Sequence, residues 1–334
     1  MQSLFQEYDL THIAKNIRAP ISSAASMPDD SCLVSPAYLA LTGRYGYFNT
    51  SEKDSVLSYF IHPHDSEWAM VLPMLGPTRP SLFKATINHL NNSYRKICFG
   101  RFQRHQLDVL QKQLMIDTYF WCENKDHLVM DWAYPFHILD TKAVSRAEGP
   151  AYRKLRQKIK DIEKAPEKLT ELRLADGGND TLKMLRYVLK IWQASMIWND
   201  KDIDDINSYY ELLFSYINNQ PTHFDGLIFM DENEMPAGFS IWEKPFHNQT
   251  VFLANLCDIK VAHLSYYQRM RSCAVLANEG TYQLNIGGSE TKGLDQAKRH
   301  VFAPAKSIQL YTSELHIAEN ENQLPQNSTA HTLA

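Results

Sequence analysis

The sequence has few of the features that mark several common protein classes. Its 334 residues include five cysteines, an odd number without a Cys-x-x-Cys pair. We therefore expect reduced, mostly buried thiols and no zinc site. No run approaches the roughly 20 consecutive apolar residues of a membrane span, and the N-terminus lacks the basic and apolar regions of a signal peptide. These absences predict a cytoplasmic protein.

Common catalytic and cofactor motifs are also missing. The chain has no P-loop, Rossmann fingerprint, His-Glu-x-x-His or Gly-x-Ser-x-Gly. The His-Pro-His-Asp stretch at residues 62–65 lacks the ligand spacing of a helix or hairpin, so we predict no metal site. The net charge is −4. An RNA or nucleotide partner would therefore have to bind a local basic patch rather than respond to the overall field.

The composition is that of a globular protein with two domains. Apolar residues make up 44% of the chain and aromatic residues 11%. We predict an N-terminal lobe over residues 1–145, a basic linking helix over 146–168 and a C-terminal lobe over 169–318. Residues 319–334 are rich in Asn, Gln, Ser and Thr and are predicted to be a disordered tail.

The first lobe alternates strand-like and helical segments. Strands are predicted at residues 56–61, 69–73, 118–122 and 127–134, and helices at 80–91 and 106–114. The alternation predicts a mixed α and β lobe.

The linking helix is predicted over residues 149–163, with a proline in its first turn. Apolar residues recur at helical spacing, and cationic residues cover the rest of the surface. Arg153, Arg156 and Lys160 fall three and four apart, close to one edge. Two interpretations stay open, a solvated face and a phosphate-binding surface.

The second lobe has a clearer pattern. Helices are predicted at residues 181–194, 207–218 and 263–278, a hairpin at 226–230 and 236–242, and strands at 250–258 and 281–286. This order of elements is similar to the topology of GNAT acyltransferases.

Residues 283–299 are the most informative segment, predicted as a strand, a polar glycine loop and a short basic helix. Gly287 and Gly288 allow a sharp turn and a close approach to a ligand. The remaining polar residues of the segment are Asn285, Ser289 and Glu290 at the strand end, and Lys298 and Arg299 on the helix. Two interpretations stay open, a binding site and an ordinary β-to-α turn.

The pattern Asn-x-Gly-Gly-Ser-Glu-Thr-x-Gly-Leu-x-x-x-Lys-Arg-x-Phe-x-Pro, beginning at Asn285, resembles a motif of GNAT-like aminoacyl and acyl transferases. These include the C-terminal domain of phosphatidylglycerol lysyltransferases and the FemABX peptidyltransferases. Residues 131–134, 149–159, 192 and 255–258 carry further likeness, so the resemblance covers about residues 120–312. It implies an α/β (α+β) fold of tandem GNAT-like lobes, each a mixed, mostly antiparallel sheet flanked by helices, with the site between them.

Two departures from that family affect the expected substrates. Nothing here corresponds to the membrane-spanning flippase domain of the lysyltransferases, which favours a small soluble or peptide acceptor. Residues 258–271 contain no glycine, whereas acetyl-CoA-dependent enzymes place a glycine-containing pyrophosphate loop there. The resemblance therefore implies aminoacyl-tRNA as the donor and co-substrate, with no cofactor.

The resemblance and the chemistry together suggest roles for the site residues. Asn285, Lys298 and the amides of Gly287 and Gly288 are candidate donors to a developing oxyanion. Asp258 would bind the donor's α-ammonium or act as a base, unless it caps the next helix.

The substrate-binding set also includes Ser289 and Glu290, with Arg153, Arg156 and Arg299 as phosphate ligands. Two alternatives stay open. One is an N-acyltransferase that uses acyl-CoA or an acyl-carrier protein, and the other is a non-catalytic GNAT-like module that binds an amino acid or peptide.

Overall fold

The structure is a computed structural model that describes residues 35–42, 44–49, 55–61, 67–76, 79–114, 119–120, 134–164, 169–198, 204–243, 249–289 and 291–315. Several predictions fall outside these residues. They concern the stretch at 62–65, the strand over 127–133, Glu290 and the tail at 319–334.

The first sheet has six strands in the order β1-β2-β3-β4-β13-β5. They are β1 (Arg44–Asn49), β2 (Val56–Ile61), β3 (Trp68–Val71), β4 (Lys96–Phe102), β5 (Tyr119–Phe120) and β13 (Tyr311–Leu315). Only the pair β3 and β4 is parallel among the described pairings. Helices α2 (Pro36–Thr42), α3 (Pro80–Asn91) and α4 (Arg104–Leu114) accompany this sheet.

Both faces of this sheet are covered. On β2, Leu57 and Tyr59 pack in a core with residues of α3 and α4, whereas Val56 and Phe60 pack in a core that includes α2. Successive strand residues point to opposite faces, so a strand buried on both sides becomes a continuous apolar run. That is why residues 56–61 were recognisable as a strand.

The second sheet has seven strands in the order β12-β6-β11-β10-β9-β8-β7. They are β6 (Phe136–Asp140), β7 (Thr170–Arg173), β8 (Phe224–Met230), β9 (Pro236–Glu243), β10 (Gln249–Cys257), β11 (Gln283–Asn285) and β12 (Lys306–Ile308). Among the described pairings, β10 with β11 is parallel and the others are antiparallel.

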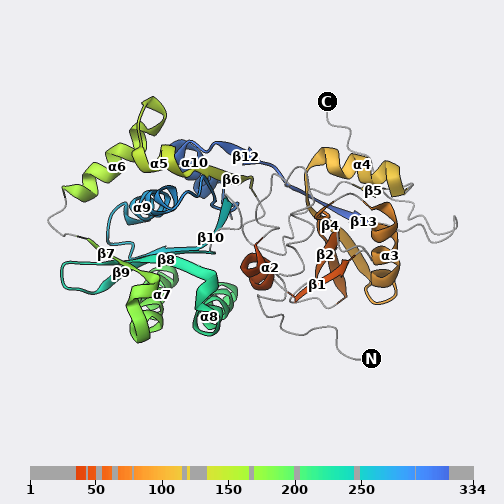
Figure 1. The fold of residues 1–334 in the computed structure, drawn as a ribbon, viewed down its shortest axis with the longest axis horizontal. Helices are drawn as coiled ribbons and strands as arrows, with labels where there is room; N and C mark the ends of the chain where they lie inside the picture. Colours follow the sequence, from red (N-terminus) through yellow and green to blue (C-terminus); the bar gives the residue numbers. More distant parts are fainter. Residues whose placement is uncertain are drawn as a thin grey trace.

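Helices cover both faces of the second sheet as well. They are α5 (Thr141–Arg146), α6 (Arg153–Glu163), α7 (Thr181–Trp198), α8 (Asp204–Asn219), α9 (Leu264–Asn278) and α10 (Lys292–Phe302), with 3-10 turns η3 (Pro150–Tyr152), η4 (Leu174–Asp180) and η5 (Pro221–His223). Ile228 of β8 packs with α7 and α8, while its neighbours Leu227 and Phe229 pack with α9 and α10. Figure 1 shows α7 and α8 below the sheet and α9 above it.

The sheets do not follow the predicted lobe boundaries. β6 comes before residue 145, yet it pairs with β11 and β12 in the second sheet. β13 comes before residue 318, yet it pairs with β4 and β5 in the first sheet. Figure 1 shows the chain passing from β12 across to β13 in the other half. The boundaries were drawn along the chain, whereas strand pairing joins segments that are distant in sequence.

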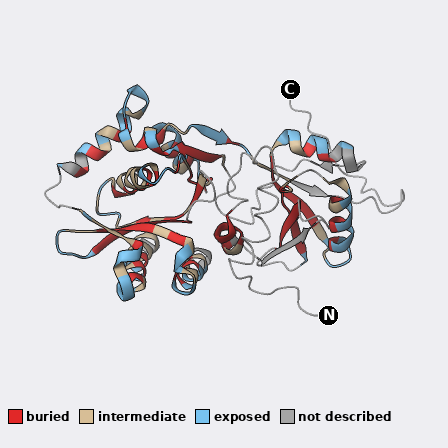
Figure 2. Cartoon of the chain, viewed as in Figure 1, coloured by how far each residue is buried: buried red, intermediate tan, exposed pale blue. Residues whose placement is uncertain are grey.

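The two halves share a core around α2. Residues of α2 pack in one cluster with residues from both sheets, and Figure 2 shows this helix buried between the halves. Ser35 Oγ and Ala37 N donate to the carboxylate of Glu243 on β9, the latter at 3.0 Å. Arg101 of β4 lies 3.9 Å from the ring centroid of Phe136 on β6. Within the described residues, no helix is both long and apolar enough to cross a membrane.

Candidate active site at the opening of the second sheet

The strands β10 and β11 run side by side for three residues and then part. Their register ends where Val251 lies beside Asn285. Beyond that point β10 continues to Cys257 paired with β9, while the chain after β11 stays with β6 through Ile286 N to His137 O at 3.0 Å. The parallel pair therefore opens where the glycine loop begins.

We define the glycine loop as residues 286–291, between β11 and α10. Gly287 has a φ of 68°, and its amide donates to Asn285 Oδ1 at 2.8 Å. From the other side, Lys298 Nζ donates to the carbonyl oxygens of Ile286 at 3.0 Å and Gly287 at 3.5 Å, and also to that of Gly288. The lysine is 5% exposed, so it holds the carbonyl side of the loop from within the protein.

This arrangement turns the loop amides the other way. In a trans peptide unit the C=O and N–H groups point in opposite directions, so the amides of Gly288 and Ser289 face away from Lys298. Asn285 is 1% exposed and Ser289 is 0% exposed. Asn285 Nδ2 and Ser289 Oγ have no hydrogen-bond partner among the residues that the structure describes. Each such buried group costs about 1–3 kcal/mol and calls for an explanation, of which a functional role is one.

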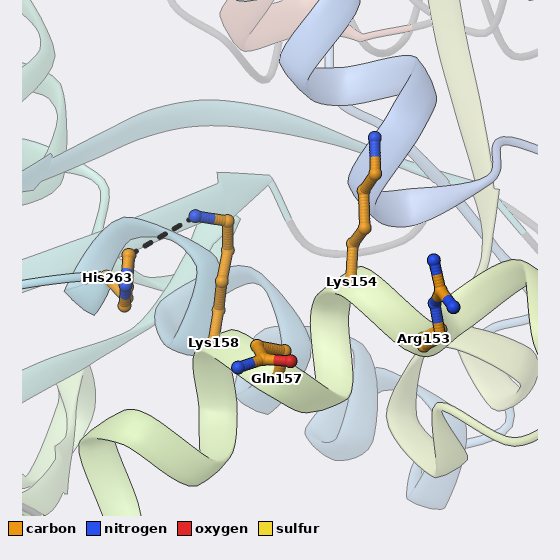
Figure 3. A pocket seen from close by; sticks show the side chains of 5 residues that line it. All are labelled: Arg153, Lys154, Gln157, Lys158 and His263. Carbon is orange, nitrogen blue, oxygen red and sulfur yellow. Dashed lines mark hydrogen bonds between the residues drawn. The ribbon is translucent and has the colours of Figure 1, made fainter.

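A basic groove lies on the same face of the sheet. Its volume is about 380 Å³, and it is lined by Arg153, Lys154, Gln157, Lys158 and His263 (Figure 3). Lys158 Nζ lies 3.3 Å from His263 Nδ1 and 4.5 Å from the centroid of the Tyr266 ring. We keep the name basic groove for this set of five lining residues.

The basic groove also receives the N-terminus of α9. His263 precedes that helix with a φ of 66°, and its side chain makes no capping hydrogen bond. Helix N-termini carry a partial positive charge that favours anions. The groove thus combines three cationic side chains, a histidine and a helix terminus, and this environment is suited to phosphate. It favours the interpretation of the linking helix as a phosphate-binding surface.

Comparisons with solved structures reveal the fold. No protein-family model matches the chain, and no curated protein matches it. A protein of unknown function from Bacteroides thetaiotaomicron superposes with a TM-score of 0.74 at 12% identity, over 93% of this chain and 99% of that one. A tandem GNAT protein from the clavulanic acid biosynthesis pathway gives 0.53 at 8% identity, over 93% and 96%. The chain has the tandem GNAT-like fold.

A third solved structure matches the other predicted likeness. The C-terminal domain of a candidate lysylphosphatidylglycerol synthetase from Agrobacterium fabrum gives a TM-score of 0.61 at 10% identity, over 92% of each chain. The predicted fold, two mixed and mostly antiparallel sheets flanked by helices, is confirmed. At these low identities the likeness establishes the GNAT-like fold and leaves the reaction to be argued from the site.

Lys298 has a different position from the one predicted. We expected its ammonium to donate to a developing oxyanion. The hydrogen bonds to the carbonyls of Ile286, Gly287 and Gly288 instead direct it into the loop. An ammonium group has three donor hydrogens, so the lysine supports the loop conformation from behind. Asn285 is the last residue of β11, and Gly287 and Gly288 follow it in the glycine loop.

Asp258 lies away from the glycine loop. Val251 is level with Asn285, and Asp258 follows it by seven residues. At roughly 3.3 Å per strand residue this is a separation on the order of 20 Å. Asp258 Oδ1 accepts from Lys260 N at 2.9 Å. It therefore closes a turn, and the residue before α9 is His263 rather than Asp258.

The three predicted phosphate ligands are found in three different settings. Arg153 lines the basic groove. Arg156 Nη1 donates to the carbonyl oxygens of Ala147 and Gly149, each at 2.6 Å, and so fixes the turn before α6. Arg299 Nε pairs with Asp295 Oδ2 at 2.9 Å. Arg153 is thus the one of the three that lies in the cavity.

No sequence pattern indicated the buried histidine beside the loop. His137 Nε2 lies 2.7 Å from Asp295 Oδ1, and His137 Nδ1 lies 2.9 Å from Ser307 Oγ. Burial lowers the pKa of His137, and the bond to Asp295 opposes that change only in part. The neutral histidine ties β6, α10 and β12 together. Its partners are 158 and 170 residues distant in sequence, so no local motif could reveal them.

Proposed function

We propose that the protein is an acyl or aminoacyl transferase of the GNAT type, with its reaction centre at the glycine loop. In the most specific form of this proposal, the protein transfers an amino acid from aminoacyl-tRNA to an amine or hydroxyl acceptor. One observation carries this proposal. Asn285 Nδ2, at the end of β11, and Ser289 Oγ, in the glycine loop, are buried and lack partners within the described chain. Lys298 holds the carbonyl side of that loop where β10 and β11 part.

The loop supplies what acyl transfer requires. The acceptor's amine attacks the ester carbonyl carbon, and the C–N bond forms as the carbonyl oxygen becomes an oxyanion. The oxyanion collapses, the C–O bond to the tRNA ribose breaks, and the departing oxygen takes a proton while the amine loses one to water. Preorganised donors stabilise such an oxyanion, and the candidates are Asn285 Nδ2, Ser289 Oγ and the amides of Gly288 and Ser289. An activated ester needs no covalent enzyme intermediate.

The basic groove would hold phosphates of the donor. It is formed by α6 and the start of α9. Helix α6 also contacts α10, the helix that follows the glycine loop. Figure 3 shows Lys154 extending toward α10 from this groove. Cationic side chains that bind phosphate contribute sequence-independent, salt-sensitive affinity, which suits the end of a tRNA.

A specific observation also favours the acyl-CoA alternative. The stretch before α9 lacks glycine, but His263 adopts the left-handed conformation that a glycine would supply. The helix N-terminus therefore remains directed at the groove, where the phosphates of a CoA could bind. Phosphate groups are common to both donors, so the assay below is designed to distinguish aminoacyl-tRNA from acyl-CoA.

The test uses a pool of radiolabelled aminoacyl-tRNAs, incubated with the protein with and without a metabolite extract. We expect enzyme-dependent and extract-dependent loss of label from one tRNA species. Consumption of acyl-CoA in a parallel thiol-release assay, without loss of label, would replace aminoacyl-tRNA by CoA as the donor. Thermal stabilisation by small amino acids with no consumption of either donor would contradict the transferase proposal and indicate a binding module.

A further inference from the structure

Arg269 on α9 is a cation whose surroundings do not neutralise it. Its Nη1 donates to Ser265 O in the same helix at a long 3.5 Å, and its Cζ lies 5.8 Å from the centroid of the Phe302 ring. Its Nε is buried without a hydrogen-bond partner in the described part of the chain. The residue as a whole is half-buried, so part of its surface is open to a ligand.

The groups that act electrostatically on Arg269 are thiols and phenols: Cys257, Tyr266, Cys273 and Tyr210. Burial raises the pKa of the Cys257 thiol to about 11 and raises that of the Cys273 thiol as well, so both are neutral at pH 7. Burial lowers the pKa of Arg269 itself. No carboxylate of the described residues forms an ion pair with this guanidinium.

Other half-buried arginines of this lobe do have carboxylate partners. Arg271, two residues further along α9, donates to both carboxylate oxygens of Glu171 at 2.6 and 3.1 Å. Arg173 donates to Glu279 at 2.9 Å and also to Asp225. Buried charges are normally paired because leaving water costs several kcal/mol per ion. Arg269 departs from this rule within its own helix.

The position of Arg269 adds to the argument. Cys257 is the last residue of β10, and Phe302 is the last residue of α10. Tyr210, also within its electrostatic range, belongs to α8 on the opposite face of the sheet. Groups from both faces of the sheet therefore act electrostatically on the guanidinium, which lies near the end of β10, beyond the point where β10 and β11 part.

We infer that Arg269 binds the carboxylate of the acceptor, an inference that rests on the proposed transferase function. Arg269 lies near the end of β10, and that end is on the order of 20 Å from the glycine loop. The acceptor class is then a peptide, whose amine can lie at the loop while its C-terminal carboxylate binds Arg269. The planar guanidinium fork matches a carboxylate with two parallel hydrogen bonds. One carboxylate neutralises the single charge, whereas a phosphate would leave an excess negative charge among aromatic rings and thiols.

The experiment measures binding separately from turnover. N-acetylglycine carries one carboxylate, and N-acetylglycinamide is its neutral isostere. We expect N-acetylglycine to raise the Tm of the full chain and N-acetylglycinamide to leave it unchanged. In Arg269→Met the carboxylate-dependent shift disappears, with a loss of about 10- to 100-fold in affinity. Arg269→Lys keeps the charge without the fork and retains part of the shift.

Arg271→Met is the matched control, because Arg271 lies on the same helix and is held by Glu171. Its carboxylate-dependent shift, measured against its own Tm, should equal that of the wild type. The ligand-free Tm of Arg269→Met should equal or exceed the wild-type value, because an uncompensated charge is removed. A lower Tm would show that Arg269 stabilises the fold and would overturn the inference, as would an undiminished shift in Arg269→Met or the absence of any shift in the wild type.

Failure of this inference and failure of the transferase proposal give different results. Turnover of a donor without Arg269-dependent carboxylate binding contradicts only the role of Arg269. Arg269-dependent binding without turnover of any donor retains the carboxylate site and contradicts the transferase.

Discussion

Each lobe contains the same unit, a strand, a helix and a parallel strand that leads into another helix. In the first lobe β3, α3 and β4 lead to α4, and in the second lobe β10, α9 and β11 lead to α10. A single residue, Gln103, separates β4 from α4. The glycine loop of six residues separates β11 from α10. The longer connection is the one with unpaired buried donors.

The two connections also differ in the partners of the buried cationic side chain that lies next to each of them. In the first lobe Arg101 is buried next to the connection. Its Nη1 donates to Tyr38 OH at 2.8 Å, and its Cζ lies 3.9 Å from the ring centroid of Phe136 on β6 in the other half. In the second lobe Lys298 holds loop carbonyls. In the first lobe the cation near this connection helps to hold the two halves together. In the second lobe the cation holds the loop carbonyls, and the loop donors stay available for a ligand. This comparison supports placing the chemistry in the second lobe.

The largest expected effect comes from removing the support of the glycine loop. Lys298→Met should destabilise the protein by about 2–5 kcal/mol, because several buried carbonyls lose a charged donor. Denaturant unfolding measures the change. Lys292→Met is the control on the same helix, since Lys292 is exposed, and it should change stability very little. Equal changes in stability in the two variants would contradict the claim that Lys298 supports the glycine loop.

Replacing two glycines of the same segment should change the free energy of unfolding by smaller amounts and in opposite directions. Gly287 has a φ of 68°, so Gly287→Ala should cost about 1–2 kcal/mol. Gly293 lies in α10 with open space around its Cβ position, so Gly293→Ala should stabilise by up to about 1 kcal/mol. Thermal unfolding measures both. Stabilisation by Gly287→Ala would show that the loop does not need its left-handed residue.

The basic groove should bind phosphates through charge. Each lost phosphate contact lowers the slope of log K against log salt by about 1, so Arg153→Ala and Lys158→Ala should each flatten the salt dependence of tRNA binding. Fluorescence anisotropy at several salt concentrations gives the slope. Lys142→Ala, an exposed lysine of α5 outside the groove, is the control, and an equal change in that variant would indicate diffuse attraction.

The contact between the halves should produce a modest pH dependence of stability. Burial raises the pKa of Glu243 to about 7, although hydrogen bonds from Ser35 and Ala37 oppose this. Between the ordinary carboxyl pKa and about 7 the folded protein binds more protons than the unfolded chain, so stability falls as pH rises through that window. Glu243→Gln should flatten the free energy of unfolding against pH. An unchanged slope would assign it to other groups.

Local patterns in the sequence predicted much of the second lobe. The helices, the hairpin and the glycine loop occur in the predicted order, because periodicity, turn residues and capping act over short distances. The helix predicted over residues 80–91 has the predicted ends. Strand β4 was not predicted, since Gly100 and Arg101 interrupt its apolar pattern.

Long-range partners were beyond the reach of local patterns. The exchange of β6 and β13 depends on pairing between segments far apart in sequence. The partners of Lys298 and Arg156 are backbone carbonyls, which every residue possesses and no sequence pattern marks. The motif thus indicated where the site lies but not which of its cations support it.

The most direct test of the central claim is the effect of Ser289→Ala on the rate of acyl transfer, measured with whichever donor the pool assay reveals. The Oγ of Ser289 is buried and unpaired within the described residues, so its removal should leave the Tm equal or higher. We predict a rate lower by about 10- to 100-fold, and an unchanged rate in the control Ser145→Ala, whose hydroxyl bonds to a carbonyl of its own helix. An unchanged rate in Ser289→Ala would contradict the assignment of the glycine loop as the reaction centre.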